Sequence, residues 1–387
     1  MDLNERILAI PPSPTLAVTN RAKALVAAGE KVCSFGAGEP DFDTPEHIKK
    51  AAIRALEQGE TKYAPTAGLA PLRAAIAEKL SHENGLSNAP EQILVSSGAK
   101  HSLFNLFMVL CRPGDEVLIP APYWVSYPEM VKIAGGTPVI VPTSEAEGFK
   151  MSPAALQRAL TPRSKALVLN SPSNPAGVVY TAEELQALAE VAAGKGLYIV
   201  SDEIYEKLVY DGLKHVSVGA FSRMIFERTI TVNGFSKAYA MTGWRLGYLA
   251  GPRPIVNAAS ALQDHTTSGP NTFAMYGALD ALRGPQDCVR EMAAAFAQRR
   301  DYIYARLSAM PGVQCVKPQG AFYVLPNIAS FGLSSAVFAE RLLDKQQVAL
   351  VPGYAFGVDA NVRLSYACSM ANIREGMDRI ESFLQAV

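Results

Sequence analysis

The sequence predicts an α/β fold in which a mainly parallel, doubly wound sheet of seven strands is joined to a smaller α+β domain. From Ile93 onward, short apolar runs alternate with stretches of helical periodicity, which is the pattern of strand–helix–strand units. Several apolar runs are near-continuous, as expected of strands that are covered on both faces. The helical stretches between them favour crossovers, and crossovers place neighbouring strands in parallel.

The N-terminal segment is expected to contain an arm and then helices. Pro11-Pro12-Ser13-Pro14 favours a stiff, extended chain without regular structure. Proline and hydroxyl start signals and glycine stop signals mark the helices that follow. The expected elements are an arm and a helix within residues 1–30, a strand at 31–35, a helix that Thr44-Pro45 starts and that ends before Gly59, an exposed loop at 60–70 and a helix at 72–80.

The sheet is expected to begin at residue 93. Its predicted strands are Ile93–Ser96, Glu116–Pro120, Pro138–Val141, Ala166–Asn170, Tyr198–Val200, Ile230–Val232 and Leu246–Leu249. Helices are expected at 99–110, 124–134, 152–160 and 181–194, so that most of the strands are separated by a helix.

The pattern changes after residue 270. A long helical stretch from Ala274 to Met310 is interrupted by Arg283-Gly284-Pro285, and short strands then alternate with helices. The predicted strands are 322–325, 348–351 and 362–365, and the predicted helices are 335–345 and 371–385. The expected division is an arm and part of the small domain at 1–45, a large domain at 46–275 and a small domain at 276–387, with both termini contributing to the small domain.

Composition is typical of a packed globular protein and argues against nucleic-acid or lipid partners. The 387 residues include 36 basic and 36 acidic side chains, so no net charge attracts a polyanion. Five cysteines are scattered singly without metal-ligand spacing, which favours reduced thiols and no metal site. No secretory signal or membrane-length apolar run is present, and a cytoplasmic location is expected.

Reactive or planar side chains follow five of the predicted strands. Ligands of open parallel sheets bind beyond the carboxyl ends of the strands, so residues that directly follow strands are candidates for a site. These segments are Ser96–Lys100, Ala121–Trp124, Ser171–Gly177, Ser201–Tyr205 and the loop that leads to Lys237. Because all five segments face the same edge of the sheet, the sequence predicts one common site.

Lys237 is the residue around which this site is expected to form. It follows the β-branched run Thr229–Val232 and the turn dipeptide Asn233-Gly234, with Ser236 beside it and Arg245 eight positions further on. Such an amine can form a Schiff base with an aldehyde, and the hydroxyl and guanidinium can bind a phosphate. A phosphorylated aldehyde cofactor is therefore expected. For an isolated lysine, an exposed loop position is the alternative.

Four side chains suit the ring of such a cofactor. Asp202 would keep a pyridine nitrogen protonated, which makes the ring an electron sink. Trp124 offers a flat face on which the ring can stack. Asn174 and Tyr205 can hydrogen-bond a ring oxygen. Taken singly, Trp124 could instead be a core residue, Asp202 a helix cap and Asn174 a turn residue.

Other residues are candidates for binding the phosphate of the cofactor and a carboxylate of the substrate. The phosphate-binding candidates are the backbone amides of Gly98, Ala99 and Lys100 at a helix start, with the side chains of Ser236 and Arg245. Arg363, on a predicted strand of the second domain, can clamp a carboxylate with its planar guanidinium. A surface ion pair is the alternative for Arg363.

Seven motifs occur in a fixed order along the chain. They are Ala37–Pro45, Lys62–Pro65, Pro122–Pro128, Asn170–Gly177, Ser201–Tyr205, Ser236–Arg245 and Val362–Ser365. Together they resemble the motifs of class-I pyridoxal-phosphate aminotransferases of fold type I, and specifically of the bacterial aspartate aminotransferase subgroup. The resemblance spans essentially the whole chain, whereas each motif alone could arise by chance.

The resemblance implies a role for each candidate. Lys237 would be the Schiff-base lysine and then the base that moves a proton between the substrate Cα and the cofactor C4′, with a pKa lowered by burial and nearby cations. Asp202 would pair with the pyridine nitrogen. Gly38 would meet the substrate carboxylate through its backbone, opposite Arg363. Tyr63 would reach the phosphate of a neighbouring subunit, which implies a homodimer with shared sites.

The resemblance also implies a substrate pair. In the aspartate-specific subgroup a lysine at the position of Lys100 reaches the second carboxylate, helped by the arm, where Ser13 and Thr15 stand. Ping-pong transfer of the amino group from L-aspartate to 2-oxoglutarate is therefore expected, and Trp124 and Asn174 would also contact the substrate. Relatives that aminate prephenate carry a lysine where this chain has Pro11. For Lys100 itself, an exposed lysine at a helix start is the alternative.

Other functions stay open at this point. An aminotransferase for alanine, aromatic, kynurenine or prephenate/arogenate substrates, or a fold-related pyridoxal-phosphate lyase, would share most of these motifs. A non-catalytic regulator that binds the cofactor is expected to carry a basic DNA-binding domain, and no such segment precedes the arm. A dehydrogenase is disfavoured because no strand is followed by a Gly-x-Gly-x-x-Gly motif.

Overall fold

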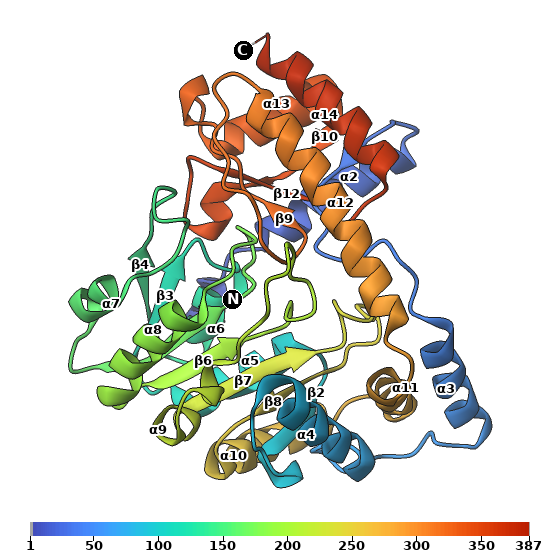
Figure 1. Ribbon diagram of the computed structural model, residues 1–387, viewed down its shortest axis with the longest axis vertical. Coiled ribbons are helices and arrows are strands. Elements are labelled where there is room, and N and C mark those ends of the chain that lie inside the picture. The colour runs from blue at the N-terminus through green and yellow to red at the C-terminus, as the bar shows by residue number, and fades with distance from the viewer. Residues whose placement is uncertain (1–2, 387) are drawn as a thin grey trace.

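The computed structural model describes residues 3–386 and has a seven-stranded sheet at the centre of its larger part (Figure 1). The strands are β2 (Ile93–Ser96), β3 (Glu116–Ala121), β4 (Thr137–Pro142), β5 (Ser164–Asn170), β6 (Tyr198–Asp202), β7 (Thr229–Gly234) and β8 (Gly247–Ala250). Their order is β2-β8-β7-β6-β5-β3-β4, and β8 alone runs antiparallel to both of its neighbours. The predicted mainly parallel, seven-stranded sheet is confirmed.

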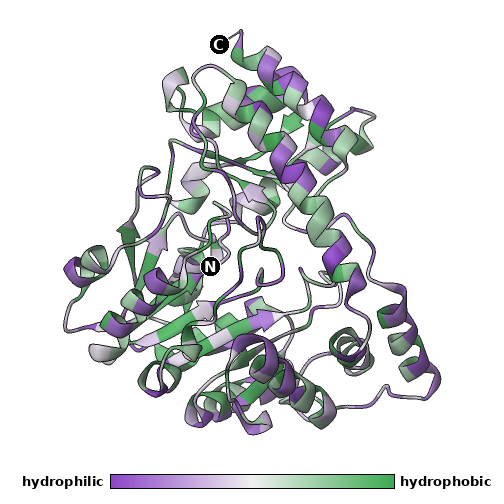
Figure 2. Ribbon diagram, viewed as in Figure 1, coloured by the Kyte–Doolittle hydropathy of each residue, from purple (hydrophilic) through white to green (hydrophobic). Residues whose placement is uncertain are grey.

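Helices cover both faces of the sheet, which makes it doubly wound. On β3, Val117 and Ile119 pack with α5 (Ala99–Leu110), α6 (Ser126–Ile133) and α10 (Arg253–Asp264), whereas Leu118 between them packs with α7 (Pro153–Ala159), α8 (Ala182–Gly194) and α9 (Arg223–Phe226). Successive side chains of a strand point to opposite faces, so strands buried on both sides must be apolar throughout. Figure 2 shows this apolar character along the central strands.

Local sequence signals explain where the covering helices begin. At the start of α8 the Thr181 hydroxyl accepts a hydrogen bond from the Glu184 N–H at 3.2 Å, and the Glu184 carboxylate accepts one from the Thr181 N–H at 2.7 Å. This reciprocal capping satisfies two donors that the helix itself leaves free. Asn271 caps α11 (Thr272–Arg283) in a similar way, through a bond from the Ala274 N–H at 3.0 Å.

The smaller part of the molecule is built from both ends of the chain. β1 (Cys33–Ser34) pairs in parallel with β10 (Val348–Ala349), which joins the N-terminal segment to the C-terminal one. A second sheet has the order β11 (Val351–Pro352), β12 (Val362–Ser365), β9 (Tyr323–Val324) and is antiparallel. The long helix α12 (Asp287–Ala309), α13 (Ser335–Gln346) and α14 (Met370–Leu384) pack around these strands (Figure 1).

The N-terminal segment differs in part from the expectation of an extended arm. It contains a short helix, α1 (Glu5–Leu8), and Pro14 is the first residue of α2 (Pro14–Ala27). Proline is well tolerated in the first turn of a helix, because its missing N–H would have no helical partner there. The extended portion therefore ends at Ser13, directly before the helix.

Asn233 and Gly234 are also placed differently from the prediction. They do not form a turn but continue β7, where they pair with Tyr248 and Gly247 of β8. A Cβ on Gly234 would lie 2.9 Å from the Cα of Gly247, so close contact between the strands explains the glycine. The chain leaves the sheet only after Gly234, which shortens the path to Lys237.

The remaining elements complete the large part. α3 (Glu46–Glu57) and α4 (Ala70–Asn84) pack with α11 against β2 and β8. The predicted boundary after residue 275 falls inside α11, and the division into domains stays a prediction. The short 3-10 helices are η1 (Pro90–Gln92), η2 (Val218–Ala220), η3 (Ala329–Phe331) and η4 (Gly353–Phe356). Within residues 3–386, no helix has both the length and the hydropathy of a membrane span.

Candidate active site

A cavity of about 300 Å³ opens at the carboxyl ends of the parallel strands, between the sheet and the smaller part. Its walls include twelve of the residues that the sequence singled out: Thr15, Gly38, Ala99, Lys100, Trp124, Asn174, Asp202, Tyr205, Ser236, Lys237, Arg245 and Arg363. They come from five strand ends, the N-terminal segment and β12. The predicted convergence on one edge of the sheet is therefore present in the structure.

Lys237 stands in the loop that follows β7. Its Nζ donates a hydrogen bond of 2.6 Å to the carbonyl oxygen of Gly38, which comes from the N-terminal segment. Burial lowers the pKa of Lys237 to about 8, and the charges of Arg245 and Arg363 act in the same direction against that of Glu39. A neutral amine, the nucleophilic form, is thus accessible near neutral pH.

Asp202 ends β6 and is only 4% exposed. Burial raises the pKa of its carboxyl to about 6, although two hydrogen bonds favour the ionised form. These come from the Tyr127 hydroxyl at 2.6 Å and from the Ile204 N–H at 3.2 Å. A buried carboxylate of this kind, without a cation bonded to it, suits a cationic ring nitrogen.

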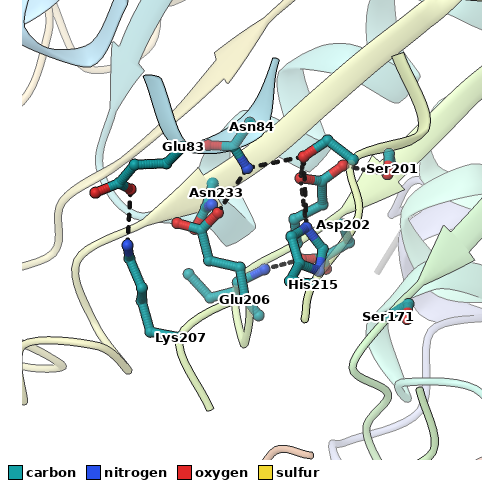
Figure 3. Close-up of polar contacts among 12 residues, drawn as sticks. Glu83, Asn84, Ser171, Ser201, Asp202, Glu206, Lys207, His215 and Asn233 are labelled. Atoms are coloured by element: carbon teal, nitrogen blue, oxygen red, sulfur yellow. Dashed lines mark hydrogen bonds and ion pairs between the residues drawn. The ribbon is translucent and has the colours of Figure 1, made fainter. Parts of the chain in front are cut away.

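A network of charged groups lies beside the strand end that carries Asp202 (Figure 3). Glu203 accepts hydrogen bonds from Ser201 at 2.7 Å and Ser217 at 2.5 Å, and lies 2.9 Å from His215 Nε2. Glu206 contacts the ammonium of Lys79. Burial opposes ionisation of Glu206, but the charges of Lys79 and His215 outweigh it and lower its pKa to about 2.

This network could be mistaken for a metal centre. Glu203, Glu206 and His215 offer ligand atoms within 4.8 Å of one another. However, their oxygens already accept hydrogen bonds from serine and asparagine side chains, and Lys79 supplies the positive charge. We interpret the network as charge-paired support for the β6 end, with no metal required.

The phosphate-binding candidates meet at the start of α5. A Cβ on Gly98 would lie 2.5 Å from the Arg245 Nη2, so only glycine lets the guanidinium approach the helix start so closely. Arg245 itself has a φ of 55°, an uncommon left-handed conformation for a non-glycine residue. Free N–H groups at the first turn, the Ser236 hydroxyl and this guanidinium together form a site for an anion.

Arg363, on β12, also lines the cavity and is 3% exposed. Its Nη2 donates to the Gly36 carbonyl oxygen at 2.8 Å, and its Nη1 donates to Asn174 Oδ1 at 3.1 Å. Its guanidinium carbon lies 4.5 Å from the centroid of the Tyr323 ring. The guanidinium is therefore held in one orientation by its neighbours, ready for a planar anion such as a carboxylate.

Lys100 and Trp124 form another wall of the cavity. The Lys100 Nζ lies 4.9 Å from the centroid of the Trp124 ring, within the range of a cation–π contact. Burial lowers the pKa of Lys100, and the charge of Arg245 adds to this effect. Thr15, near the start of α2, lines the same cavity, so the N-terminal segment borders the site.

Comparison with known proteins shows the family to which this chain belongs. Residues 30–380 match the family Aminotransferase class I and II. This chain belongs to that family. An aspartate aminotransferase from Geobacillus stearothermophilus is 50% identical over 391 residues, covering 100% of both chains. A probable aspartate/prephenate aminotransferase from Aquifex aeolicus is 49% identical, covering 100% of this chain and 99% of its own.

A solved structure agrees with this assignment. The aspartate aminotransferase from Thermus thermophilus with maleate superimposes with a TM-score of 0.95 at 48% identity, covering 99% of both chains. The chain is therefore an aminotransferase that uses pyridoxal phosphate, as proteins of this type do. The predicted family, fold, enzyme class and cofactor are confirmed.

The residues of this aminotransferase fit the cofactor. The cavity holds an amine on Lys237, a carboxyl on Asp202 and an anion site at the start of α5, which match an aldehyde, a pyridine nitrogen and a phosphate. The carboxyl of Asp202 has no cationic partner within hydrogen-bond distance among the described residues, and a protonated ring nitrogen would supply one.

Three predicted residues of the aminotransferase do not line the cavity. Gly98 shapes it indirectly, through the close approach of Arg245. Ser13 bonds the Thr15 hydroxyl at 2.9 Å and contacts the site through that residue. Tyr63 is 93% exposed and lies in a separate surface hollow with residues 61–64 and 267–273. A role for Tyr63 therefore requires a second subunit.

Two tyrosines that line the cavity, Tyr127 and Tyr323, were not predicted. Tyr127 bonds Asp202, and it stands within the quoted motif Pro122–Pro128, so the motif could have indicated it. Tyr323 lines the cavity and bonds Tyr205, but in the sequence it reads as an ordinary aromatic residue of a buried strand. Only the contacts of Tyr323 with Tyr205 and Arg363 in the folded protein reveal its position.

Proposed function

We propose that this aminotransferase transfers the amino group of L-aspartate to 2-oxoglutarate and so produces oxaloacetate and L-glutamate. The observation that carries the proposal is the presence of two separate cations, Arg363 and Lys100, in the cavity beyond the phosphate site. A dicarboxylic amino acid has one carboxylate for each. The relatives named aspartate aminotransferase support this choice.

Arg363 and Gly38 are proposed to bind the α-carboxylate. The Nη2 and Nη1 atoms of Arg363 already donate to Gly36 and Asn174, which fixes the plane of the guanidinium, so the substrate needs to order no flexible side chain. Gly38 lines the same cavity, and its carbonyl oxygen accepts a hydrogen bond from the Lys237 ammonium. Binding of the substrate thus places its Cα beside the Lys237 amine.

Lys237 is proposed to attach the cofactor and then to carry the proton. When bound, pyridoxal phosphate supplies an aldehyde for an amine and a ring that withdraws electrons from the substrate Cα. After the substrate amine has replaced it on the cofactor, the freed Lys237 amine would take the proton from Cα and hold it for the adjacent cofactor carbon. Its pKa of about 8 lies close to neutral pH, where a group can both accept and donate a proton efficiently.

The other residues are proposed to hold the ring. Asp202 would pair with the pyridine nitrogen and keep it protonated, and Trp124 would stack on one face. Asn174 and Tyr205 would hydrogen-bond the ring oxygen. The Ala99 and Lys100 amides, Ser236 and Arg245 would bind the phosphate, whereas the predicted Gly98 N–H already donates to the Ser96 carbonyl oxygen at 2.6 Å.

Lys100 is proposed to select the second carboxylate, with Thr15 and Ser13 beside it. Lys100→Met should lower kcat/KM for aspartate by about 10- to 100-fold, because a hydrogen bond to a charged group contributes roughly 1.5–3 kcal/mol. The rate with alanine, which has no second carboxylate, should change little. Lys132→Met, at an exposed position on α6, is the matched control.

The test is a steady-state panel of amino donors with 2-oxoglutarate as acceptor. Aspartate should be among the best donors. In a second assay, with aspartate as donor and prephenate as acceptor, the rate should be low because Pro11 stands where prephenate-using relatives carry lysine. If alanine, an aromatic amino acid or kynurenine were far better than aspartate, or if Lys100→Met affected alanine and aspartate equally, the proposed substrate would be wrong.

We also propose that the active unit is a homodimer. Tyr63 supports this proposal, because its side chain is exposed and lies outside the cavity of its own chain, where a second subunit can contact it. Such a dimer would complete the phosphate site from a second copy of the chain. The cytoplasmic location expected from the sequence stays a prediction.

A further inference from the structure

Tyr323 occupies a position that the residues discussed so far do not explain. It lies on β9, is 1% exposed and borders the cavity. Its hydroxyl is 2.8 Å from that of Tyr205, and its ring lies 4.5 Å from the guanidinium carbon of Arg363. One side chain therefore touches both the residue that faces the cofactor ring oxygen and the residue that binds the carboxylate.

We propose that Tyr323 is a positioning residue for two parts of the site: its hydroxyl donates a hydrogen bond to Tyr205, and its ring supports Arg363. This inference rests on the proposed roles of Tyr205 and Arg363. It assigns to Tyr323 an influence on the cofactor and a separate influence on substrate binding.

The direction of the hydrogen bond follows from counting protons. Each phenol has one proton, and the 2.8 Å separation allows either hydroxyl to be the donor. Once Tyr205 donates a hydrogen bond to the ring oxygen of the cofactor, its own oxygen can only accept one from Tyr323. Tyr323 must then be the donor, and the three oxygens form a chain. In such a chain each hydrogen bond strengthens the next.

This chain of hydrogen bonds should affect the charge of the ring oxygen. A stronger donor at Tyr205 stabilises the anionic ring oxygen, which then competes less for the proton that it shares with the nitrogen of Lys237. Without the Tyr323 hydroxyl, the anion is less stabilised and that proton is held more tightly. The visible absorption of the bound cofactor should therefore titrate at higher pH.

The second influence comes from the strand pairing. β9 pairs with β12, with Tyr323 opposite Ser365 and Val324 opposite Leu364, so Tyr323 and Arg363 share one small sheet. The face of an aromatic ring attracts a guanidinium and fixes its plane. Gly38 closes the remaining side, since a Cβ there would lie 2.8 Å from the Tyr323 hydroxyl. Tyr323 has no room to move away from Arg363 toward Gly38.

Two substitutions separate these influences. Tyr323→Phe removes the hydroxyl and keeps the ring, whereas Tyr323→Leu removes both. The matched control is Tyr366→Phe: Tyr366 is buried in the same part of the molecule, outside the cavity wall, and donates to the Ala321 carbonyl at 3.3 Å. Each variant is purified with its cofactor, the visible absorption is titrated with pH, and maleate binding is measured by calorimetry.

We expect Tyr323→Phe to titrate at a pH higher by roughly half a unit or more, with the dissociation constant for maleate within about twofold of the unsubstituted protein. Tyr323→Leu should show the same shift and bind maleate about fivefold or more weakly, because the ring beneath Arg363 is lost. Tyr366→Phe should match the unsubstituted protein in both measurements. A merely structural role would lower stability in all three variants without moving the titration.

Two results would overturn the proposal. If Tyr323→Phe titrated like Tyr366→Phe, the hydroxyl would have no influence on the cofactor. If Tyr323→Phe bound maleate as weakly as expected for loss of the ring, the division between hydroxyl and ring would be wrong. Failure of the proposed function looks different: the unsubstituted protein would then lack a titrating visible band or would not bind maleate.

Discussion

At the residue scale, burial in the cavity sets the proton affinity of the two groups that would contact the cofactor. It lowers the pKa of Lys237 to about 8 and raises that of Asp202 to about 6. Both shifts favour the neutral form, and they bring an amine and a carboxyl much closer in proton affinity than they are in water. The types of these residues were evident from the sequence, but their pKa values depend on the packing around them.

The rate of cofactor uptake by the apoprotein should therefore depend on pH in a particular range. Because the pKa of Lys237 is lowered, its reactive neutral form is already present near pH 7, and the uptake rate should rise with pH and level off above about 8. The rate is followed by stopped-flow absorbance after pyridoxal phosphate is added. A rate that continued to rise toward pH 10.5 would show an unperturbed lysine.

Asp202, Asn174 and Lys237 were expected near one another because the carboxyl ends of parallel strands lie at one edge of a sheet. The structure brings the three side chains to one cavity, and their roles stay predictions. Tyr323 was missed because its proposed role depends on contacts with Tyr205 and Arg363. Tyr205 lies 118 residues before it in the chain, and Arg363 lies on another strand. No local pattern carries that information.

At the scale of elements, the strands were easier to predict than the segments around them. All seven strands of the large sheet are present, because long apolar runs between turn signals leave few alternatives. The start of α2 at Pro14 was missed because proline both breaks helices and begins them. Asn233-Gly234 was assigned to a turn because its partners on β8 are distant in sequence.

The charge network connects α4 to the end of β6 and provides an element-scale prediction. Lys79→Met should destabilise the protein by about 3–5 kcal/mol at pH 7, because Glu206 would keep a buried charge without its closest cation. Urea unfolding measures the change. Lys207→Met, which removes a half-exposed pair with Glu83, is the control and should cost less than about 1 kcal/mol.

The same network has a defined pH dependence. The pKa of Glu206 is lowered in the folded state to about 2, so its contribution to stability is complete above the unfolded value of 4.5 and is lost as pH falls toward 2. Lys79→Met should weaken this acid sensitivity. An unchanged free energy of unfolding in Lys79→Met, or an unchanged acid transition, would contradict the assigned pairing.

At the scale of the whole molecule, the site exists only because distant parts of the chain meet. Gly38 comes from the N-terminal segment, Arg363 from the small C-terminal sheet and Lys237 from the large sheet. The ordered motifs predicted this assembly through a family resemblance. The order of strands in the sequence predicts which residues lie at one edge of the large sheet. The position of Arg363 relative to Lys237 depends on how the two parts pack, which the sequence pattern does not show.

The proposed shared site can be tested with hybrid dimers. Tyr63→Ala should weaken pyridoxal phosphate binding by about tenfold or more, since a bond to phosphate is lost. A hybrid of one Tyr63→Ala subunit and one Lys237→Ala subunit contains one intact site if Tyr63 serves its neighbour. At limiting cofactor, such hybrids, purified with two different tags, should show about half the activity of the unsubstituted dimer. Hybrids no better than the Tyr63→Ala dimer would show that Tyr63 does not act across subunits.

The central claim is that Lys237 bears the cofactor, and covalent mapping tests it most directly. The purified protein is reduced with borohydride, digested and analysed by mass spectrometry. The account predicts a visible band that borohydride removes, one pyridoxyl-phosphate modification on Lys237, and loss of both in Lys237→Ala. A modification at another lysine, or a protein that stays colourless after incubation with pyridoxal phosphate, would contradict it.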